Sequence, residues 1–400
     1  MVCHACSSEG QCKPTCPVLQ KLKEFSPKIK EEFSGSSPPE IFVGRYNYPQ
    51  VNVGILSPAE FGNTEERSMP EIWFEKKMTI SQIFSARSSM IYSRFKSSIK
   101  FIKKDKNLST MQEVALAAKP AAMEFKLFRK PALRSKLDKI MPMIGNPAIL
   151  KSAKFQENVK VDKKVDYLTN DTDVKSSIAM QELHKSKISV SNIIKIFSAG
   201  LLGVRKQRKL VPTRWSVTAT DSIISGNFLK DIRHFSVIND FRLFHSEYLD
   251  NHYEILMIPQ QFSYEVIEAK IPGSIWNPNQ QVTFWKDYES YFGRKEYAFN
   301  VTGGYYSIRL PVTEYFMRIQ RQASVFIMRE VRPGYNLPCG VGILREIARD
   351  ALKGKFESFS DLNSALSVAQ ERMNLPITQF TNQSVLLKEL KDQRKLDFFK

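Results

Sequence analysis

The sequence predicts a mixed α/β (α+β) protein, with a globular core preceded by a small cysteine-rich segment and followed by a short aromatic tail. Of its 400 residues, 42% are apolar and 25% are charged, which is typical of a folded globular chain long enough for two or three domains. Apolar residues alternate at 41–56, as in strands, and recur three and four residues apart at 359–373, as in a helix. Because the sequence has no internal repeat and no regular βαβ alternation, we expect neither a solenoid nor a parallel sheet.

The predicted elements follow from local composition and periodicity. We expect five segments: a cysteine knuckle at 1–17, a short helix and a Gly/Ser/Pro linker at 18–40, an N-terminal core part at 41–203, a C-terminal core part at 204–384, and a terminal helix with its tail at 385–400. Within the core we expect a hairpin at 41–56, one long or two consecutive helices at 70–102, charged helices and loops up to 171, a buried helix at 188–202 that Gly200 and Gly203 end, two strands at 255–271, and helices at 340–352, 359–373 and 384–390.

The charge balance indicates a polyanionic partner. The chain carries 59 Lys and Arg against 41 Asp and Glu, a formal charge of +18. Nucleic acid is the commonest partner of so basic a chain. No apolar run approaches the roughly 20 residues that a membrane span requires, and the basic stretches do not form an amphipathic membrane-surface helix, so we expect no membrane partner.

The basic residues are clustered in two runs, and both runs contain or precede aromatic residues. We interpret the first run, 87–106, as a helix with one apolar stripe and one basic face, and the second, 204–214, lies just before Trp215. Basic side chains that grip phosphates beside an aromatic that stacks on a base suit single-stranded or distorted DNA. The alternative is a solvated basic helix face. The residues predicted to bind DNA are Arg94, Lys96, Lys100, Lys103, Arg205, Lys206, Arg208 and Lys209.

Four of the five cysteines lie in the first sixteen residues, in the pattern Cys3-x2-Cys6-x5-Cys12-x3-Cys16. Four thiolates at this spacing can enclose one structural zinc ion, and so short a segment has no apolar core to fold around without a metal. Two disulfides and an iron–sulfur cluster are the alternatives, but the chain shows no secretory signal. The fifth cysteine, Cys339, is predicted to be a small packed residue.

The last eight residues combine a polar anchor with apolar side chains: Gln393, Leu396, Phe398 and Phe399. This tail resembles the PCNA-interacting peptide, or PIP box, by which replication and repair proteins dock onto the sliding clamp PCNA. Gln393 stands at the polar position and Leu396 at the aliphatic position, although one residue, not two, separates Leu396 from the aromatic pair. The alternative is that these aromatics fold back on the protein's own core.

Known catalytic signatures are largely absent, and the catalytic residues are unknown. The sequence contains no phosphate loop, no HExxH and no GxSxG. A pocket for a base or nucleotide is predicted around Arg214, Trp215, Asp221, Arg294, Glu296 and Arg309, although Asp221 could instead cap a helix that starts near Ser222. Glu268 and Lys270, with Asp250, match part of a metal-dependent nuclease site, and 245–252 has a metal-binding composition; strand alternation and a surface turn are the simpler interpretations.

Several sequence blocks, taken together, resemble the archaeal Nre proteins. These blocks are the four-cysteine knuckle, Val43 to Pro49, Arg87-Ser88-Ser89, Leu201-Leu202-Gly203, Val211 to Ser216, Gly293 to Ala298, Tyr335 to Pro338 with Gly340-Val341 and Leu344-Arg345-Glu346, and the tail. The resemblance spans nearly the whole chain. It implies an archaeal cytosolic protein that acts in DNA damage repair, holds zinc at its four N-terminal cysteines and binds PCNA through its tail. The resemblance supplies no reaction.

Two hypotheses follow. The first is a non-catalytic repair factor, cytoplasmic and nucleoid-associated, that binds DNA through its basic surface while tethered to PCNA. The second is a clamp-recruited enzyme that acts on DNA or nucleotides and uses Mg²⁺ or Mn²⁺. A cavity with convergent carboxylates would favour the enzyme, and a basic surface would favour the binding protein.

Overall fold

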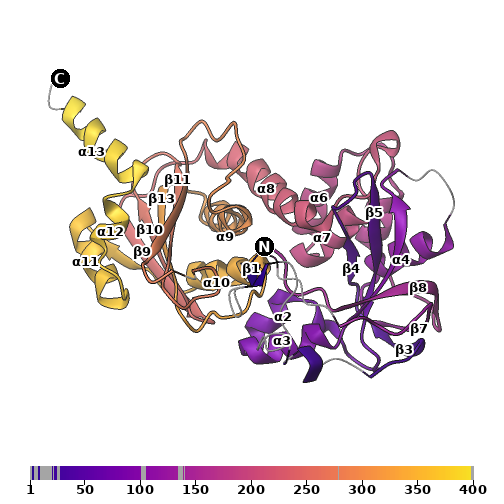
Figure 1. Ribbon diagram of the computed structural model, residues 1–400. Coiled ribbons are helices and arrows are strands. Elements are labelled where there is room, and N and C mark those ends of the chain that lie inside the picture. The colour runs from indigo at the N-terminus through magenta and orange to yellow at the C-terminus, as the bar shows by residue number, and fades with distance from the viewer. Residues whose placement is uncertain are drawn as a thin grey trace. The chain divides into compact units, whose positions relative to one another are not determined.

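A computed structural model describes residues 2–3, 8–9, 20, 22–24, 28–100, 105–133, 138, 140–277 and 279–397, with the backbone alone at 2–3, 8–9 and 393–397 (Figure 1). The chain forms two compact units: unit 1 is Met1–Ile224 with Pro338–Ile343, and unit 2 is Ser225–Leu337 with Leu344–Lys400. Each unit combines one six-stranded mixed sheet with helices, which confirms the predicted mixed α/β class.

The sheet of unit 1 is antiparallel except at its centre, where β6 and β8 run parallel. Its strands, in spatial order, are β3 (Glu32–Ser37), β7 (Ala121–Leu127), β8 (Asn146–Phe155), β6 (Ile91–Ser98), β5 (Gln50–Ser57) and β4 (Ile41–Val43). The short strands β1 (Val2–Cys3) and β2 (Ser8–Glu9) form a separate antiparallel pair.

One face of this sheet is packed and contributes to the core. Alternate residues of its central strands, such as Val51, Val53 and Ile91, are fully buried in one cluster with Leu108 and Met111 of α4. Because successive side chains of a strand point to opposite faces, the residues between them lie on the other face. The helices of unit 1 are α2 (Pro70–Glu75), α3 (Ile80–Ser88), α4 (Lys106–Leu116), α5 (Lys163–Asn170), α6 (Ser176–Lys185) and α7 (Val190–Ser198), with the 3₁₀ turns η1 (Glu65–Arg67) and η2 (Arg205–Gln207).

Residues 34–37, predicted as part of a flexible linker, belong instead to the edge strand β3. The Gly/Ser content serves a close contact here, because a Cβ atom at Gly35 would collide with the carbonyl oxygen of Pro58. Ser36 also donates its backbone N–H to the carbonyl of Glu60, at 2.8 Å. Small residues therefore allow two backbones to meet, and the composition was wrongly interpreted as flexibility.

The helix predicted for the first basic run is also wrong, because 91–98 form strand β6. The prediction of helices at 70–102 holds only for α2 and α3, which end at Ser88. Over so short a run the apolar residues fit the period of a helix as well as that of a strand. The pairing of β6 with β5 and β8 favours the strand. Strands β7 and β8 were likewise missed in a stretch predicted to be helices and loops.

Unit 2 contains the elements that the sequence predicts there, together with strands and a helix that it does not predict. Its sheet order is β12 (Thr283–Glu289), β11 (Tyr264–Lys270), β13 (Ser324–Val331), β10 (Asn251–Ile258), β9 (Phe241–Tyr248) and β14 (Glu357–Phe359). Its helices include α9 (Gly303–Ile319), α11 (Leu362–Arg372), α12 (Thr378–Thr381) and α13 (Val385–Asp397), and the chain passes between the units within α8 (Thr213–Ile232) and α10 (Val341–Lys353). The expected strands at 255–271 and helices at 340–352, 359–373 and 384–390 are confirmed, whereas β9, β12, β13, β14 and α9 were not predicted. In unit 1 the hairpin at 41–56 and the helix before Gly200, now α7, are confirmed too.

Candidate nucleic-acid interface

The second face of the unit 1 sheet carries a row of polar and aromatic side chains. Tyr92, Arg94 and Lys96 occupy alternate positions of β6 and so share this face, and their exposure increases along the strand from buried Tyr92 to exposed Lys96. On the neighbouring strand Asn52 stands opposite Lys96, and Gly54 stands opposite Arg94. A Cβ atom at Gly54 would collide with the carbonyl oxygen of Ser93, so glycine allows β5 and β6 to approach closely at this point.

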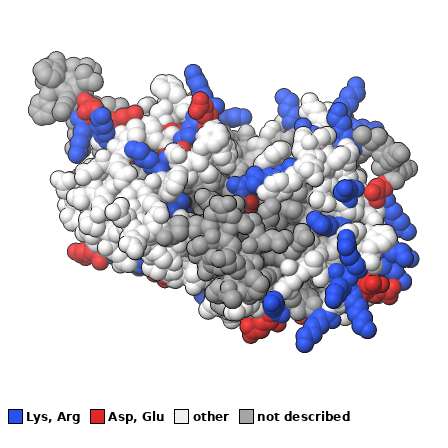
Figure 2. Space-filling view, in the orientation of Figure 1, with Lys and Arg blue, Asp and Glu red and all other residues white. Residues whose placement is uncertain are grey.

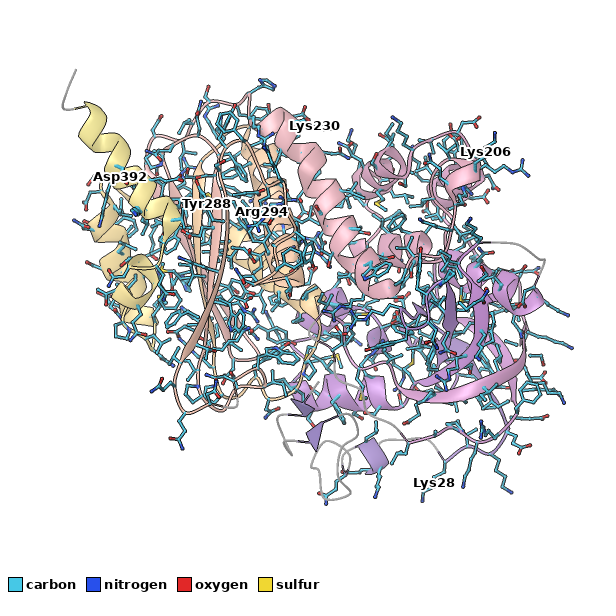
Figure 3. The ribbon with its side chains drawn as sticks, turned by 45° about the horizontal axis from the view of Figure 1, so that its top comes forward. Lys28, Lys206, Lys230, Tyr288, Arg294 and Asp392 are labelled. Atoms are coloured by element: carbon cyan, nitrogen blue, oxygen red, sulfur yellow. The ribbon has the colours of Figure 1, made fainter. Side chains whose placement is uncertain are left out.

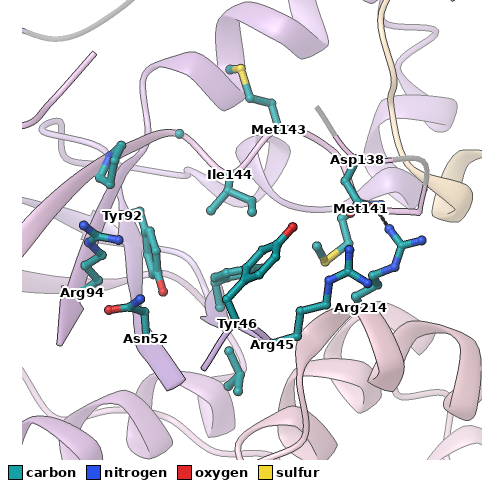
Figure 4. A pocket seen from close by; sticks show the side chains of 15 residues that line it. Arg45, Tyr46, Asn52, Tyr92, Arg94, Asp138, Met141, Met143, Ile144 and Arg214 are labelled. Atoms are coloured by element: carbon teal, nitrogen blue, oxygen red, sulfur yellow. Dashed lines mark hydrogen bonds and ion pairs between the residues drawn. The ribbon is translucent and has the colours of Figure 1, made fainter. Parts of the chain in front are cut away.

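A cavity of about 260 Å³ opens on this face. Figure 4 shows Asn52, Tyr92 and Arg94 grouped on one side of the cavity, Arg45, Asp138 and Arg214 on the other, and the ring of Tyr46 between the two groups. The remaining lining residues are mostly apolar: Phe42, Val43, Gly44, Met141, Met143, Ile144, Gly145 and Pro147. The cavity thus has an apolar body and two separate polar ends.

Several polar groups of the cavity lack a partner within the described part of the chain. The Tyr92 hydroxyl is buried and makes no hydrogen bond there, and burial raises the pKa of Tyr92, so the hydroxyl stays protonated. The guanidinium groups of Arg45 and Arg94 form no ion pair with any described residue, whereas Arg214 is paired with Asp138. A buried hydroxyl without a partner costs free energy, and a ligand that bonded to it would recover that cost.

Backbone hydrogen bonds join three segments of unit 1. Pro49, after β4, accepts a hydrogen bond from the backbone N–H of Ile99 at 3.0 Å, and Ile99 in turn accepts one from Leu210 at 2.9 Å. Since Ile99 precedes Lys100 and Leu210 follows Lys209, these bonds bring the two basic runs together at these positions. The rings of Tyr48 and Trp215 are 5.7 Å apart.

The resulting surface combines exposed aromatic rings with basic side chains. Tyr46, Tyr48 and Trp215 are 56%, 44% and 46% exposed, which is unusual for large aromatic residues. Lys96, Lys100 and Lys209, on the segments connected by these bonds, are also exposed. We call these six residues the basic aromatic surface.

The net charge of the protein is concentrated in unit 1. Residues 1–224 hold 37 Lys and Arg against 21 Asp and Glu, or +16, whereas residues 225–400 hold 22 against 20, or +2. Figure 2 shows the imbalance on the face that it draws, where blue side chains far outnumber red ones over unit 1. An anionic partner is therefore attracted to unit 1.

The second basic run has two roles. Arg208 is half-buried and donates to the backbone carbonyls of Gly203, Thr169 and Asp171, at 2.8, 2.7 and 2.6 Å. Burial lowers the pKa of the Arg208 guanidinium. Its three hydrogen bonds connect this loop to the end of α5. Arg205, Lys206 and Lys209 are exposed, and Lys206 projects from the ribbon at η2 (Figure 3). Lys103 of the first run lies outside the described residues.

The residues of the predicted pocket are divided between the units. Arg214 lines the cavity and Trp215 lies in the basic aromatic surface, both on the first turn of α8. Asp221 is fully buried in the middle of α8, so its predicted role as a cap is wrong: the helix begins at Thr213, directly after Pro212.

Unit 2 holds the other three predicted pocket residues, which lie on or near β12. Arg294 pairs with Asp287 at 3.1 Å, and Arg309 pairs with Glu289 at 2.9 Å and is nine-tenths buried or more. Glu296 is exposed and accepts a bond from Arg294 through its backbone carbonyl. Figure 3 shows Arg294 near Tyr288 of the same strand region.

The metal sites considered from sequence have other partners where they are described. Glu268 is paired with Arg329 and lies 3.8 Å from Lys270, while Asp250 accepts the backbone N–H of Gly334 at 2.6 Å. Among the described residues no three His, Cys, Asp or Glu side chains are grouped as metal ligands. Of the zinc residues only the backbone of Cys3 is described, in β1; Cys6, Cys12 and Cys16 lie outside the described residues.

Sequence reasoning missed the cavity residues Arg45, Tyr46, Asn52 and Tyr92. The first two belong to the block Val43–Pro49, which was noted only as part of a family resemblance. The alternation of Tyr92, Arg94 and Lys96 was a usable signal once 91–98 is treated as a strand. The helices of the described ranges include none long and apolar enough to cross a membrane.

Comparison with known proteins gives a consistent match over the whole chain. The family model described as "Archaeal Nre, N-terminal" matches residues 11–277, and "Archaeal Nre, C-terminal" matches 289–399. The chain is 33% identical over 399 residues to the DNA repair protein NreB of Archaeoglobus fulgidus, covering 100% of both chains. It is 36% identical to NreA of the same organism, covering 93% of each, and 32% identical to NreA of Haloferax volcanii, covering 92% and 91%. No solved structure matches.

Proposed function

The chain belongs to the archaeal Nre family, and on that premise we propose that it is a DNA repair factor that binds DNA through the basic aromatic surface and is recruited to the clamp PCNA by its C-terminal tail. The relatives that match over their full length are named DNA repair proteins. The DNA-binding part of the proposal is supported by one observation above all: exposed aromatic rings and exposed lysines from connected segments lie on the strongly basic unit.

The composition of this surface favours single-stranded or distorted DNA. Lysines that contact phosphates give affinity for any nucleic acid, and exposed rings add stacking only where bases are unpaired. Tyr48 and Trp215 supply such rings, and Lys96, Lys100 and Lys209 are exposed on segments that pair with or are hydrogen-bonded to the Tyr48 segment or to one another. Arg208 is not counted among these contacts, because its guanidinium is occupied by backbone carbonyls.

The cavity next to this surface favours binding over metal-dependent hydrolysis. Catalysis with Mg²⁺ or Mn²⁺ requires carboxylates that converge on the ions. Asp138 is the carboxylate among the lining residues, and its oxygen is engaged by Arg214. The other polar groups around the cavity are arginines, a tyrosine and an asparagine, which suit an anionic ligand.

Recruitment to PCNA is supported by the way α13 is anchored. Leu386, Leu387 and Leu390 are buried in the core of unit 2, whereas Lys391 and Asp392 are exposed. The end of α13 extends away from the sheet of its unit (Figure 1). Gln393 and Leu396 lie on this last part of the helix, and Phe398 and Phe399 lie outside the described residues. A tail that begins at an exposed helix end is accessible to a partner.

A structural zinc ion at Cys3, Cys6, Cys12 and Cys16 completes the proposal. In the described part of this segment β1 and β2 pair antiparallel, with Cys3 opposite Ser8. Four thiolates form a closed structural zinc site. The donor set therefore fits zinc.

The salt dependence of DNA binding tests the central claim. Replacing Lys96, Lys100 and Lys209 together by Ala is expected to lower the slope of log affinity against log salt by about two to three, at roughly 0.7 per phosphate contact on single strands and 0.9 on duplex. The control removes three exposed lysines near the β7 and β8 ends, Lys119, Lys154 and Lys160, and should change the slope little. Equal effects of both triple variants would mean that the charge acts diffusely and would overturn the assignment of the surface.

A further inference from the structure

We infer that the cavity of unit 1 binds a nucleotide, with the base at the Asn52–Tyr92–Arg94 end and the phosphate at the Arg45–Arg214 end. The inference deepens the proposed DNA binding but rests on it only in part, because a nucleotide has two possible sources: an extrahelical nucleotide of bound DNA, or a free nucleotide. Both present the same chemistry to the cavity. The two sources are separated by the experiment below.

The base end of the cavity provides hydrogen-bonding groups of both kinds. The Asn52 side chain carries an amide donor and a carbonyl acceptor, and its amide makes no bond to other described residues. The Tyr92 hydroxyl can donate and accept, and it is without a partner although Tyr92 is only 5% exposed. Asparagine and arginine are the side chains that form paired hydrogen bonds with the edges of bases.

The middle of the cavity suits the flat faces of a base. The ring of Tyr46 lies between the two polar ends (Figure 4), and Phe42 and Ile144 contribute apolar walls next to Tyr92. The ring of Phe42 meets that of Tyr92 edge-on at 5.2 Å. A base held between an aromatic ring and apolar side chains gains stacking whatever its identity.

The opposite end provides the charge for a phosphate. The Arg45 guanidinium lies 5.4 Å from the centre of the Tyr46 ring and forms no ion pair with a described residue. Arg214 is held by Asp138, which fixes its guanidinium at the cavity wall. A fixed and an unpaired guanidinium together suit a phosphate group, to which arginine binds in a bidentate manner.

The size of the cavity agrees with this ligand. Its volume of about 260 Å³ lies just below the range of roughly 300–1,000 Å³ that is typical of sites for drug-sized molecules. A cavity of this size has room for no more than one nucleotide, and a longer strand would have to continue outside the cavity. Tyr46 belongs both to the cavity lining and to the basic aromatic surface.

The test compares two arms with one conservative variant. In the first arm the full-length protein is titrated with the four deoxynucleoside monophosphates by calorimetry. In the second it is mixed with single-stranded and mismatched duplex DNA that contains 2-aminopurine, whose emission rises when the base leaves the stack. Tyr92→Phe is expected to weaken binding about tenfold in whichever arm shows it, since one hydrogen bond is lost, and to raise the Tm, since an unpaired hydroxyl is removed.

A matched control is Tyr253→Phe in unit 2, which also removes a buried hydroxyl without a partner among the described residues and should leave nucleotide binding unchanged. Arg94→Ala provides a second variant at the base end. The inference is supported if Tyr92→Phe weakens binding in either arm. Weaker binding of the monophosphates identifies a free nucleotide as the ligand, and weaker binding of DNA identifies an extrahelical nucleotide. The inference is overturned if wild type shows no response in either arm, or if both variants bind as wild type does. DNA binding lost in the Lys96, Lys100 and Lys209 variant, with neither Tyr92→Phe nor Arg94→Ala weakening binding in either arm, would overturn the cavity while leaving the proposed function standing.

Discussion

The backbone N–H of Val43 donates a 2.9 Å hydrogen bond to the hydroxyl of Thr213, although 170 residues separate them in the sequence. Thr213 begins α8, and its hydroxyl also lies 3.0 Å from that of Ser198, which itself donates to the carbonyl of Val211 at 2.8 Å. One threonine thus connects the end of β4 to the first turn of α8. This connection sets the positions of the loops that carry Tyr48 and Trp215.

We expect Thr213→Val to destabilise unit 1 by about 1–3 kcal/mol, because the substitution keeps the shape of the side chain but leaves the Val43 N–H without its acceptor. The measurement is urea unfolding followed by tryptophan fluorescence, to which the fully buried Trp73 of unit 1 contributes. Thr110→Val is the control, since Thr110 donates only to the carbonyl of Lys106 within its own helix and should cost little. Equal destabilisation by both variants would show that the bond between Val43 and Thr213 has no special role.

Trp215→Ala is expected to weaken single-stranded DNA binding by about 1–3 kcal/mol if a base stacks on the indole ring. Fluorescence anisotropy with a labelled oligonucleotide measures the effect. Trp285→Ala is a matched control, because Trp285 is 41% exposed against 46% for Trp215 and lies in unit 2. Unchanged affinity in Trp215→Ala, with the helix content intact by circular dichroism, would exclude stacking at this position.

The elements of unit 2 that the sequence predicts correctly have a signal that is visible locally. The elements at 340–352 and 359–373 are amphipathic helices whose period is visible locally, and the strands around 259–263 are bounded by clear turn residues. In unit 1 the strand β6 carries charged residues on its second face, so its composition is typical of a surface helix. The sheet partners β5 and β8 decide its conformation, and those partners are distant in sequence.

The candidate site also depends on contacts between residues that are distant in the sequence. The basic runs and Trp215 are conspicuous in composition, so their residues could be named from the sequence. The cavity could not be predicted, because its lining combines alternate residues of β6 with Arg45 and Tyr46, Asp138 and Arg214, which are distant in the sequence. Local patterns identify residue types, whereas these contacts determine which of them meet.

Glu265 predicts a pH dependence of unit 2. Its carboxylate accepts bonds from Ser384 and from the N–H groups of Val385 and Leu386, and it so anchors the start of α13. Burial nevertheless raises the pKa of Glu265 above its ordinary value of 4.5. The folded state then holds this proton more tightly than the unfolded state, so the contribution of Glu265 to stability falls as pH rises from 4.5 through the raised pKa.

Glu265→Gln removes this titration. We expect the free energy of unfolding of the variant, relative to that of wild type, to be highest above the raised pKa of Glu265 and lowest below pH 4.5. Denaturant unfolding of wild type and variant at a series of pH values gives the difference. Glu371→Gln, at an exposed position of α11, should show no such trend. A difference that grows in favour of wild type as pH rises would have the wrong sign and would reject the account.

Metal removal is expected to expose four cysteines and leave the fifth protected. Burial raises the pKa of Cys339 to about 12, so its thiol is unreactive in the folded protein. Iodoacetamide labelling read by mass spectrometry should modify Cys3, Cys6, Cys12 and Cys16 after treatment with a chelator, and Cys339 only in denaturant. Metal analysis should give one zinc per chain. Stoichiometric zinc that survives Cys12→Ser with Cys16→Ser would contradict the proposed ligands.

The C-terminal tail should bind PCNA through its apolar residues. Leu396→Ala combined with Phe399→Ala is expected to remove anchors worth roughly 2 kcal/mol or more each when buried in a partner, and calorimetric titration with the clamp measures the loss. Lys391→Ala, at an exposed position of the same helix, is the control. Retained affinity after Phe398→Ala alone would identify Phe399 as the main aromatic anchor. We expect this result because only one residue separates Leu396 from Phe398, so that Phe399 lies closer to the usual aromatic position. If the tail instead packs on the protein's own core, the double variant should keep its affinity for the clamp and should lower the free energy of unfolding of unit 2.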